Sequence, residues 1–398
     1  MEKKLQIFLE KGYQINEWSV LQKDRARKKP QISAGIIFKS LLYQTMLGIK
    51  SILKLDQHHR TRRAKRMLES ERKMVVSDST LLRVLEKWEI EFTSEALYAC
   101  HKKLRARGLA SLKLRSGKKV MPAIVDGTCL GNHWFSVLSF GGKVYHGVDA
   151  EPYEGRGHEL NASRRLIRRV HEKIGDSFAT HILYDGLMAD RKDFEMAREF
   201  NTHLLVKTSE ETLSVIEDHQ GLWNGSLSEE LLQKTGTEIA KGFDAEHGMK
   251  YETYCARKDR WEGLRYPLSV CRVRETHVKG KYKNQTLTFW ILTTDLSLTG
   301  LELRELAHTR WKIENNGFKE LNEQTGSKKA YIKNPKVKQA WLLIVMLGML
   351  LLKAFENHLS SDSDWIALTA KKTKSYLAQL ILDSIAFSTD TQLLEAPP

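Results

Sequence analysis

Apolar residues recur at helical spacing through the first 112 residues, as at Ile36, Ile37 and Leu41. Because glycine and proline are sparse there, and a helix buries every third or fourth residue, this spacing predicts a series of helices. A helix start is predicted at Ser77, where short polar side chains precede LLRVLEKWEIEF and can cap free backbone N–H groups. Short helices with basic connections suit a helix-turn-helix-like bundle that binds DNA.

From residue 120 the apolar runs become short and alternate with helical segments. Helices are predicted at 161–175 and 190–201. Strands are predicted at 120–130, 133–140, 143–150, 180–186 and 202–209, the second and third joined by a turn at Gly141-Gly142. Three consecutive strands followed by alternating helix and strand is the element order of a ribonuclease H-like α/β domain.

Residues 210–290 interrupt this alternation. Segments at 249–259, 268–278 and 285–294 are β-prone and predict a β-rich insertion. One long helix is predicted at 298–324, an apolar helix at 337–358 and a weakly amphipathic helix near 371–387. The apolar run 340–352 is shorter than the ~20 residues that a membrane-spanning helix needs, so we expect a buried core helix.

The positive charge lies almost entirely in the first third of the chain. The net charge is +15, yet residues 1–119 hold 28 Lys and Arg against 12 Asp and Glu, and the remainder is nearly neutral. This polarity favours an N-terminal module for a polyanion; a basic helical domain without a partner is the alternative. The candidate contacts in its basic segment are Arg62, Arg63, Lys65 and Arg66.

The composition excludes several classes of protein. Hydrophobic residues make up 41% and charged residues 28%, with 7 Pro, which excludes a disordered or collagen-like chain. The four cysteines are far apart and form no C-x-x-C pair, so we expect reduced thiols in a cytoplasmic protein. Since no signal-peptide, lipidation or phosphate-loop motif is found, neither a membrane nor a nucleotide is expected as a partner.

Two carboxylates stand where open α/β sheets bind ligands. Asp126 and Asp185 each follow an apolar strand and precede glycine, and a strand's carboxyl end is where such sheets form their crevice. Glu314 is the third candidate, with Arg310 four residues earlier on the same helix face. Three carboxylates can hold Mg²⁺, because this cation prefers oxygen ligands. Alternatively, the two aspartates are ordinary turn residues at the ends of strands, and Arg310 and Glu314 form an ordinary ion pair on a helix surface.

The segments AIVDG, LYDGLMADRKDF and HTRWKIENNGFKEL together resemble the DDE transposases of bacterial insertion sequences, and in particular the insertion-sequence-4 group. The resemblance covers roughly residues 70–355. It implies that Asp126, Asp185 and Glu314 are the catalytic, metal-binding triad. The spacings of 59 and 129 positions fit, since the second leaves room for an insertion domain in the catalytic domain.

The resemblance implies cut-and-paste transposition of DNA. Two Mg²⁺ ions, with Mn²⁺ as a substitute, would activate water to nick a transposon end, and the freed 3′-OH would form a hairpin and later attack target DNA. The implied partners are double-stranded transposon ends and target DNA, bound by a homodimer in the synaptic complex. The expected location is the bacterial cytoplasm, at the nucleoid.

The sequence departs from the group's signature around the glutamate. The signature's tyrosine and lysine positions hold Ala307 and Leu321 here, whereas its arginine and glutamate match Arg310 and Glu314. Lys319 is nearby, but five residues past Glu314 on an α-helix it is turned ~140° away. We therefore expect it to be a poor substitute for the lysine that contacts DNA.

Further DNA contacts are predicted with a structural alternative for each. Arg164, Arg165 and Arg168 form a basic row on one predicted helix, which would either grip DNA or be a solvated face. Trp261 stands among basic residues and would either stack on a flipped base or pack in the core. Trp290, in the apolar segment FWIL, is expected in the core.

The resulting organisation has five parts. They are an all-α DNA-binding domain at 1–119, a ribonuclease H-like core at 120–209 and 291–358, the β-rich insertion at 210–290, and a helical tail at 359–398. Two other functions share these features. A DNA-binding protein without catalysis would need only the basic module, and a metal-dependent nuclease or resolvase would cleave strands without joining them.

Overall fold

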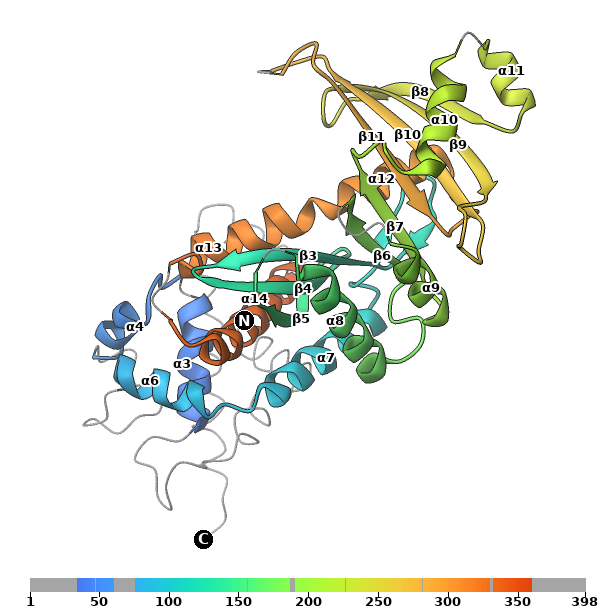
Figure 1. The fold of residues 1–398 in the computed structure, drawn as a ribbon. Helices are drawn as coiled ribbons and strands as arrows, with labels where there is room; N and C mark the ends of the chain where they lie inside the picture. Colours follow the sequence, from blue (N-terminus) through green and yellow to red (C-terminus); the bar gives the residue numbers. More distant parts are fainter. Residues whose placement is uncertain are drawn as a thin grey trace.

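The computed structural model describes residues 34–46, 48–60, 76–155, 157–186, 190–225, 227–280, 282–329 and 332–359. These residues form an α/β fold on one large mixed β-sheet, which crosses the molecule with helices packed against it (Figure 1). The helix expected near 371–387 lies outside the described residues.

The sheet has nine strands in the described part of the chain, in the order β5-β4-β3-β6-β7-β11-β10-β9-β8. Neighbouring strands are antiparallel except β3, β6 and β7, which run parallel. The bounds are β3 Pro122–Leu130, β4 His133–Gly141, β5 Tyr145–Tyr153, β6 His181–Asp185, β7 His203–Thr208, β8 Glu238–Asp244, β9 Met249–Asp259, β10 Leu268–His277 and β11 Thr286–Thr293.

The helices between these strands follow the sequence prediction. α8 (Glu159–Ile174) connects β5 to β6, and α9 (Arg191–Glu199) connects β6 to β7. α8 buries one face that includes Leu166 and Val170, because its apolar residues recur at helical spacing. The expected order of three strands, helix, strand, helix and strand is therefore confirmed.

The strands of residues 210–290 extend the same sheet. β11 pairs with β7 along Trp290 to Thr293, and β10, β9 and β8 follow it outward. Two helices that the sequence pattern did not predict, α10 (Ser214–Asn224) and α11 (Glu229–Lys234), precede β8. The stretch is thus rich in strands, as expected, and continuous with the sheet that carries Asp126 and Asp185.

The described N-terminal residues form four helices: α3 (Ala34–Met46), α4 (Ile52–His59), α6 (Asp78–Glu86) and α7 (Ile90–Ala106). Ser77 caps α6 as expected, since its side chain accepts a hydrogen bond from the Thr80 backbone at 3.2 Å. α7 ends six residues earlier than the predicted helical region, and Gly108 follows with a left-handed φ of 70°. A two-stranded ribbon, β1 (Leu112–Lys113) and β2 (Lys119–Val120), leads into the large sheet.

α14 (Pro335–Leu359) holds the N-terminal helices against the sheet. It packs on α3, α6, α7 and β5, and its apolar residues share one core with theirs (Figure 1). It is the one helix in the described residues that is long and apolar enough to cross a membrane, but it is almost wholly buried in the protein. This burial confirms the expected core helix and is consistent with a soluble protein.

Trp290 of β11 and Trp223 of α10 are buried together beside the strands β8 to β11. Trp290 is 1% exposed and stacks on Trp223 of α10 with ring centroids 5.5 Å apart, so its predicted core position is confirmed. The Arg272 guanidinium lies 5.6 Å from the centre of the Trp223 ring and 6.0 Å from that of the Trp290 ring. Large aromatic side chains bury much apolar area, so this stacked pair contributes strongly to the stability of the core.

We therefore expect Trp290→Ala to lower the free energy of unfolding by about 3–5 kcal/mol, because it opens a large cavity next to Trp223. Urea denaturation of the full chain measures this change. The matched control is Leu287→Ala on the same strand, whose side chain is exposed; it should change stability by less than about 0.5 kcal/mol. Equal losses in the two variants would contradict the core role of Trp290.

Candidate active site

Asp126 and Asp185 lie side by side on the parallel strands β3 and β6. Ile124 is opposite Leu183, and the two aspartates follow two residues later on each strand. Asp185 ends β6 as expected, whereas Asp126 lies inside β3, because β3 continues to Leu130 as a hairpin with β4. The Asp126 side chain is 17% exposed and that of Asp185 is half-exposed.

Glu314 joins these aspartates through Arg310. The Arg310 guanidinium lies 3.3 Å from Asp126 Oδ2, 3.8 Å from Asp185 Oδ2 and 3.1 Å from Glu314 Oε1. The arginine side chain is buried, and a buried charge is costly unless it is paired. One guanidinium therefore gathers the three carboxylates that the sequence singled out from three distant segments.

The helix that carries Arg310 starts at a fixed point. Thr299 and Glu302 form a capping box at the beginning of α12 (Gly300–Arg310), in which each side chain bonds the other's backbone N–H. Leu303, Leu306 and Ala307 pack beneath the helix in the core on that side of the sheet. Capping and packing together place the last residue of α12, Arg310, over β3 and β6.

Glu314 lies on a π-helical segment, η3 (Ile313–Lys319), which leads into α13 (Glu320–Thr325). The single helix predicted at 298–324 is thus interrupted at the glutamate. Hydrogen bonds in a π-helix run from residue i to i+5, and such segments are frequent at functional sites. Gly317 allows Tyr145 to pack against the segment, since a Cβ at this position would lie 2.3 Å from the tyrosine hydroxyl.

The π-helix changes the expected place of Lys319. A π-helix has more residues in each turn than an α-helix, so Lys319 is turned less far from Glu314 than an α-helix would place it, and both side chains are exposed. The α-helical geometry on which the expected ~140° rotation of Lys319 rested therefore does not apply to this segment. Ala307 and Leu321, at the signature's tyrosine and lysine positions, are both buried among apolar residues.

The electrostatics of the cluster centre on Asp126. Burial raises the pKa of Asp126 to about 7; Arg310 opposes the shift, and the negative charges of Glu159, Asp185 and Glu314 add to it. Without a further cation, three neighbouring carboxylates therefore share one guanidinium, and like charges in such a site disfavour full ionisation.

A buried lysine beside the cluster was not predicted. Lys207 on β7 is opposite Asp185 in the parallel register of β6 and β7. Its ammonium lies 4.2 Å and 4.0 Å from the ring centres of Phe289 and Trp311, and burial lowers its pKa to about 8, with Arg310 adding to the shift. The available signal was a lysine directly after the apolar run 204–206, but a lysine near the end of a strand or on an edge strand gives the same pattern.

A fourth carboxylate, also missed, is Glu159 at the first position of α8. It lies against Gly127, next to Asp126, and the Tyr153 hydroxyl donates to it at 3.3 Å. Nothing in the sequence distinguishes Glu159 from an acidic residue that favours a helix N-terminus, where the backbone N–H groups are free.

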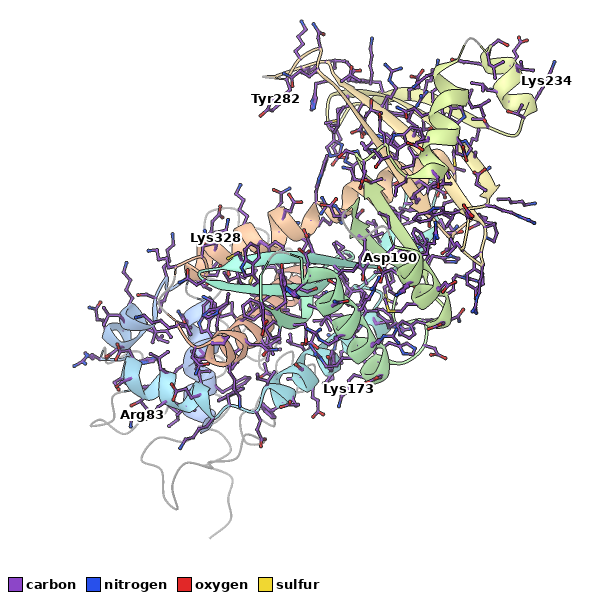
Figure 2. All side chains as sticks on the ribbon, viewed as in Figure 1. Arg83, Lys173, Asp190, Lys234, Tyr282 and Lys328 are labelled. Carbon is purple, nitrogen blue, oxygen red and sulfur yellow. The ribbon has the colours of Figure 1, made fainter. Side chains whose placement is uncertain are left out.

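The basic row of α8 is largely engaged in ion pairs. Arg164 binds Asp193 at 2.8 Å and Asp190, labelled in Figure 2, at 2.5 Å, which ties α8 to α9. Arg165 is exposed and pairs with Glu151 at 2.8 Å. Arg168 is exposed and forms no ion pair within the described ranges. DNA contact by these three arginines stays a prediction. Among them, Arg168 is the one whose N–H groups are not engaged in an ion pair with a described residue and could bind a DNA phosphate.

Trp261 packs in the core rather than presenting a face to solvent. Its side chain is 6% exposed, meets Phe194 edge-on with centroids 6.0 Å apart, and has the Arg191 guanidinium over its ring at 5.3 Å. Base stacking would require the ring to leave these contacts, so this role stays a prediction. Arg62, Arg63, Lys65 and Arg66 lie outside the described residues.

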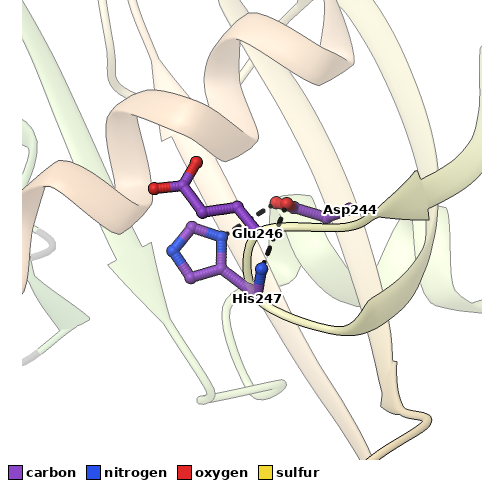
Figure 3. Close-up of side chains that lie close together, drawn as sticks. All are labelled: Asp244, Glu246 and His247. Atoms are coloured by element: carbon purple, nitrogen blue, oxygen red, sulfur yellow. Dashed lines mark hydrogen bonds and ion pairs between the residues drawn. The ribbon is translucent and has the colours of Figure 1, made fainter.

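A second group of potential metal ligands, Asp244, Glu246 and His247, lies at the turn between β8 and β9. Asp244 accepts hydrogen bonds from the backbone and the ring of His247 (Figure 3) and forms ion pairs with Arg304 at 3.1 Å and Arg115 at 3.3 Å. Burial would raise the pKa of Asp244, but the hydrogen bonds from His247, Arg304 and Arg115 outweigh it and hold this pKa well below its usual range. Because Asp244 is already neutralised by basic side chains, this cluster is a poor competitor for a metal ion.

The cluster around Arg310 suits a hard divalent cation better. Its three ligands are carboxylates, the oxygen donors that Mg²⁺ and Mn²⁺ take in proteins. They carry more negative charge than one guanidinium neutralises, and Asp126 is mostly desolvated. Asp126, Asp185 and Glu314 thus fit such an ion.

No protein-family model matches the sequence, and no curated protein matches it.

The raised pKa of Asp126 predicts how stability depends on pH when no divalent cation is bound. The folded state binds the Asp126 proton more tightly than the unfolded chain, so this contribution is present at low pH and is lost as pH rises from about 4 through 7. Asp126→Asn should therefore be more stable than wild type at pH 8 by roughly 1–3 kcal/mol, and equally stable near pH 4.

Urea unfolding in a chelating buffer at both pH values measures this difference. The control is Asp218→Asn, at an exposed position of α10, which should match wild type at both pH values. An Asp126→Asn variant that is less stable than wild type at pH 8 would show that the attraction of Arg310 outweighs burial.

Proposed function

We propose that this chain is a metal-dependent transposase of the DDE type, which cuts and joins DNA at the ends of an insertion sequence. The observation that carries the proposal is the contact of Arg310 with Asp126, Asp185 and Glu314. The resemblance to the insertion-sequence-4 group named these three carboxylates and this arginine from separate segments. Their meeting at one point supports a common role.

The sheet topology supports a ribonuclease H-like catalytic domain. β5, β4 and β3 form an antiparallel meander, and β6 and β7 continue it in parallel from β3. Asp185 lies at the carboxyl end of β6, and Asp126 lies on the parallel neighbour β3; the carboxyl ends of parallel strands are where open α/β sheets bind their ligands. The additional strands β8 to β11 correspond in sequence to the insertion expected between the second and third carboxylate.

The charge distribution supports DNA as the substrate. The surplus of basic residues in 1–119 suits a DNA-binding module, which would bind transposon ends, and the synaptic complex would contain two protomers. A protein of this kind would act in the bacterial cytoplasm, at the nucleoid.

The carboxylates, Arg310 and Lys207 would have different roles in phosphodiester cleavage. When bound, two Mg²⁺ ions would supply an activated water or 3′-OH and stabilise the leaving oxygen. Asp126, Asp185 and Glu314 would hold them. Arg310 would then release the carboxylates and donate its N–H groups to a phosphate, for which a guanidinium is well shaped. Lys207 would add positive charge beside Asp185.

We expect Asp126→Asn, Asp185→Asn and Glu314→Gln each to lose nicking and strand transfer by several orders of magnitude, because each removes a charged metal ligand. Binding of end DNA should remain within a few-fold of wild type. Gel assays with Mg²⁺ on uncut and pre-cleaved end DNA measure the two reactions, and Ca²⁺ should support binding with little chemistry.

The matched control is Glu323→Gln, an exposed glutamate on α13, which should keep full activity. The assays also separate the alternatives. Nicking without strand transfer would favour a nuclease or resolvase. Full activity in all three amide variants would contradict the catalytic proposal and favour a DNA-binding protein without catalysis.

If the N-terminal basic segment binds DNA, the affinity of the protein for duplex DNA should fall steeply as the salt concentration rises, and this dependence should require the basic residues of that segment. Because α3, α6 and α7 share a core with α14, the test uses the full chain. Changing Arg62, Arg63, Lys65 and Arg66 to glutamine should weaken duplex binding and flatten the log–log salt slope by roughly 0.9 for each lost phosphate contact.

Mobility shifts at several salt concentrations measure this slope. The control makes the same change at four exposed lysines of the strand-rich region, Lys234, Lys250, Lys279 and Lys283. An unchanged slope in the N-terminal variant, or a larger effect in the control, would place the DNA contact elsewhere.

A further inference from the structure

A buried ion-pair network joins α12 to the outer strands of the sheet. Glu275 on β10 is 1% exposed, and its Oε1 accepts hydrogen bonds from Arg304 Nε at 2.5 Å and from His308 Nε2 at 2.6 Å. Arg304 is also buried and forms a second ion pair, at 3.1 Å, with Asp244 at the end of β8. Two outer strands thus hold one helix, and that helix ends at Arg310.

This network restricts where α12 can lie. Arg304 and His308 are four residues apart, so they face the same side of the helix. Because both bind one oxygen of a residue in the sheet, they limit the rotation of α12 and its shift along its axis. A shift of one residue moves a helical side chain by about 1.5 Å along the axis and about 100° around it. Arg310 lies two residues past His308, so its 3.3 Å contact with Asp126 depends on this placement.

His308 carries the contact further towards the carboxylates. Its ring meets Trp311 edge-on with centroids 4.8 Å apart, and the Trp311 ring in turn covers the Lys207 ammonium at 4.0 Å. The hydrogen bond to Glu275 holds the His308 ring in this position. The carboxylate that restrains α12 therefore also determines where Trp311 packs, directly after Arg310 in the chain.

The Glu275 carboxylate stays charged in this buried place. Burial raises its pKa, but His308 and Arg304 outweigh that effect and lower the pKa below its usual value. Removing one partner of a buried ion pair leaves the other charge unpaired, which is costly. The apolar packing of Leu303 and Leu306 beneath α12 is not directional, whereas the hydrogen bonds of Glu275 are. These bonds therefore select one rotation of the helix.

We propose that Glu275 is a positioning residue for the carboxylate cluster, which acts through Arg304 and His308 on the place of Arg310. This inference rests on the proposed function, because the reaction that it serves is DNA cleavage at the three carboxylates. It goes further by giving the strand-rich region a part in that reaction: β10 supplies the group that orients the helix of the site.

The test measures nicking of end DNA by full-length Glu275→Gln and wild type at saturating Mg²⁺. Glutamine keeps the length of the side chain but removes the charge that Arg304 and His308 bind. The maximal nicking rate should fall by about tenfold or more, as small misplacements of reacting groups cause. The KM for DNA should stay within about twofold, because the variant leaves the DNA-binding surface unchanged.

The matched control is Asp149→Asn on β5. Asp149 is also fully buried, pairs with Arg169 at 2.8 Å and accepts a hydrogen bond from Tyr98, but these partners lie on α8 and α7 rather than on α12. Urea unfolding should show that both variants lose stability, whereas only Glu275→Gln should lose nicking. Hydrogen exchange read by mass spectrometry should accelerate at 300–319 in Glu275→Gln and not in the control.

A pair of milder variants keeps the test decisive if Glu275→Gln does not fold. His308→Gln retains an N–H donor that can reach Glu275, whereas His308→Leu retains none. His308→Leu should therefore nick several-fold more slowly than His308→Gln. Equal rates in these two folded variants would overturn the role of the hydrogen bond.

The outcomes separate this inference from the proposed function. If wild type nicks end DNA and Glu275→Gln nicks it at the same rate, the positioning role is overturned and the proposed function stands. An equal loss of nicking in Asp149→Asn would also overturn it, because the loss would then follow general stability. If wild type nicks in neither Mg²⁺ nor Mn²⁺, the proposed function fails, and the role of Glu275 in that reaction fails with it.

Discussion

The buried guanidinium of Arg310 is the interaction on which the candidate site depends. Asp126, Asp185 and Glu314 come from two strands and a segment more than a hundred residues further along, and their charges would repel one another in a partly buried cluster. Arg310 offsets that repulsion only in part. The three carboxylates are therefore gathered without a metal ion, yet they retain an excess of negative charge that would attract one under the proposed function.

The surrounding structure positions this arginine. The capping box at Thr299 determines where α12 starts, the core beneath Leu303 and Leu306 determines its orientation, and η3 then carries Glu314 back over the sheet. A π-helix weakens the hydrogen bonding of a helix, and such a segment persists where packing compensates. Here Tyr145 fills the space beside Gly317, so that the glutamate and Arg310 face the same aspartates.

The N-terminal helices are part of the same folded unit. α14 places its apolar side chains between α3, α6 and α7 on one side and the sheet on the other. Under the proposed function, a basic module that binds DNA is thus attached through one continuous core to the strands that carry the carboxylates. A shared core of this kind resists independent motion, because separating its halves would expose apolar surface to water.

The sequence by itself predicted the order of the elements from β3 to β7 and pointed to Asp126, Asp185 and Glu314 as one group, which the structure brings together around Arg310. Period-two and helical patterns located β3 to β7, α8 and α9, because burial on one face dictates which positions are apolar. Only the tertiary structure decided that the outer strands continue the same sheet, that Trp261 packs in the core, and that a π-helix interrupts α12 to α13. It alone also showed that Lys207 lies opposite Asp185 and that Glu159 packs against Gly127. Such features depend on contacts between distant segments, and neither periodicity nor local spacing contains that information.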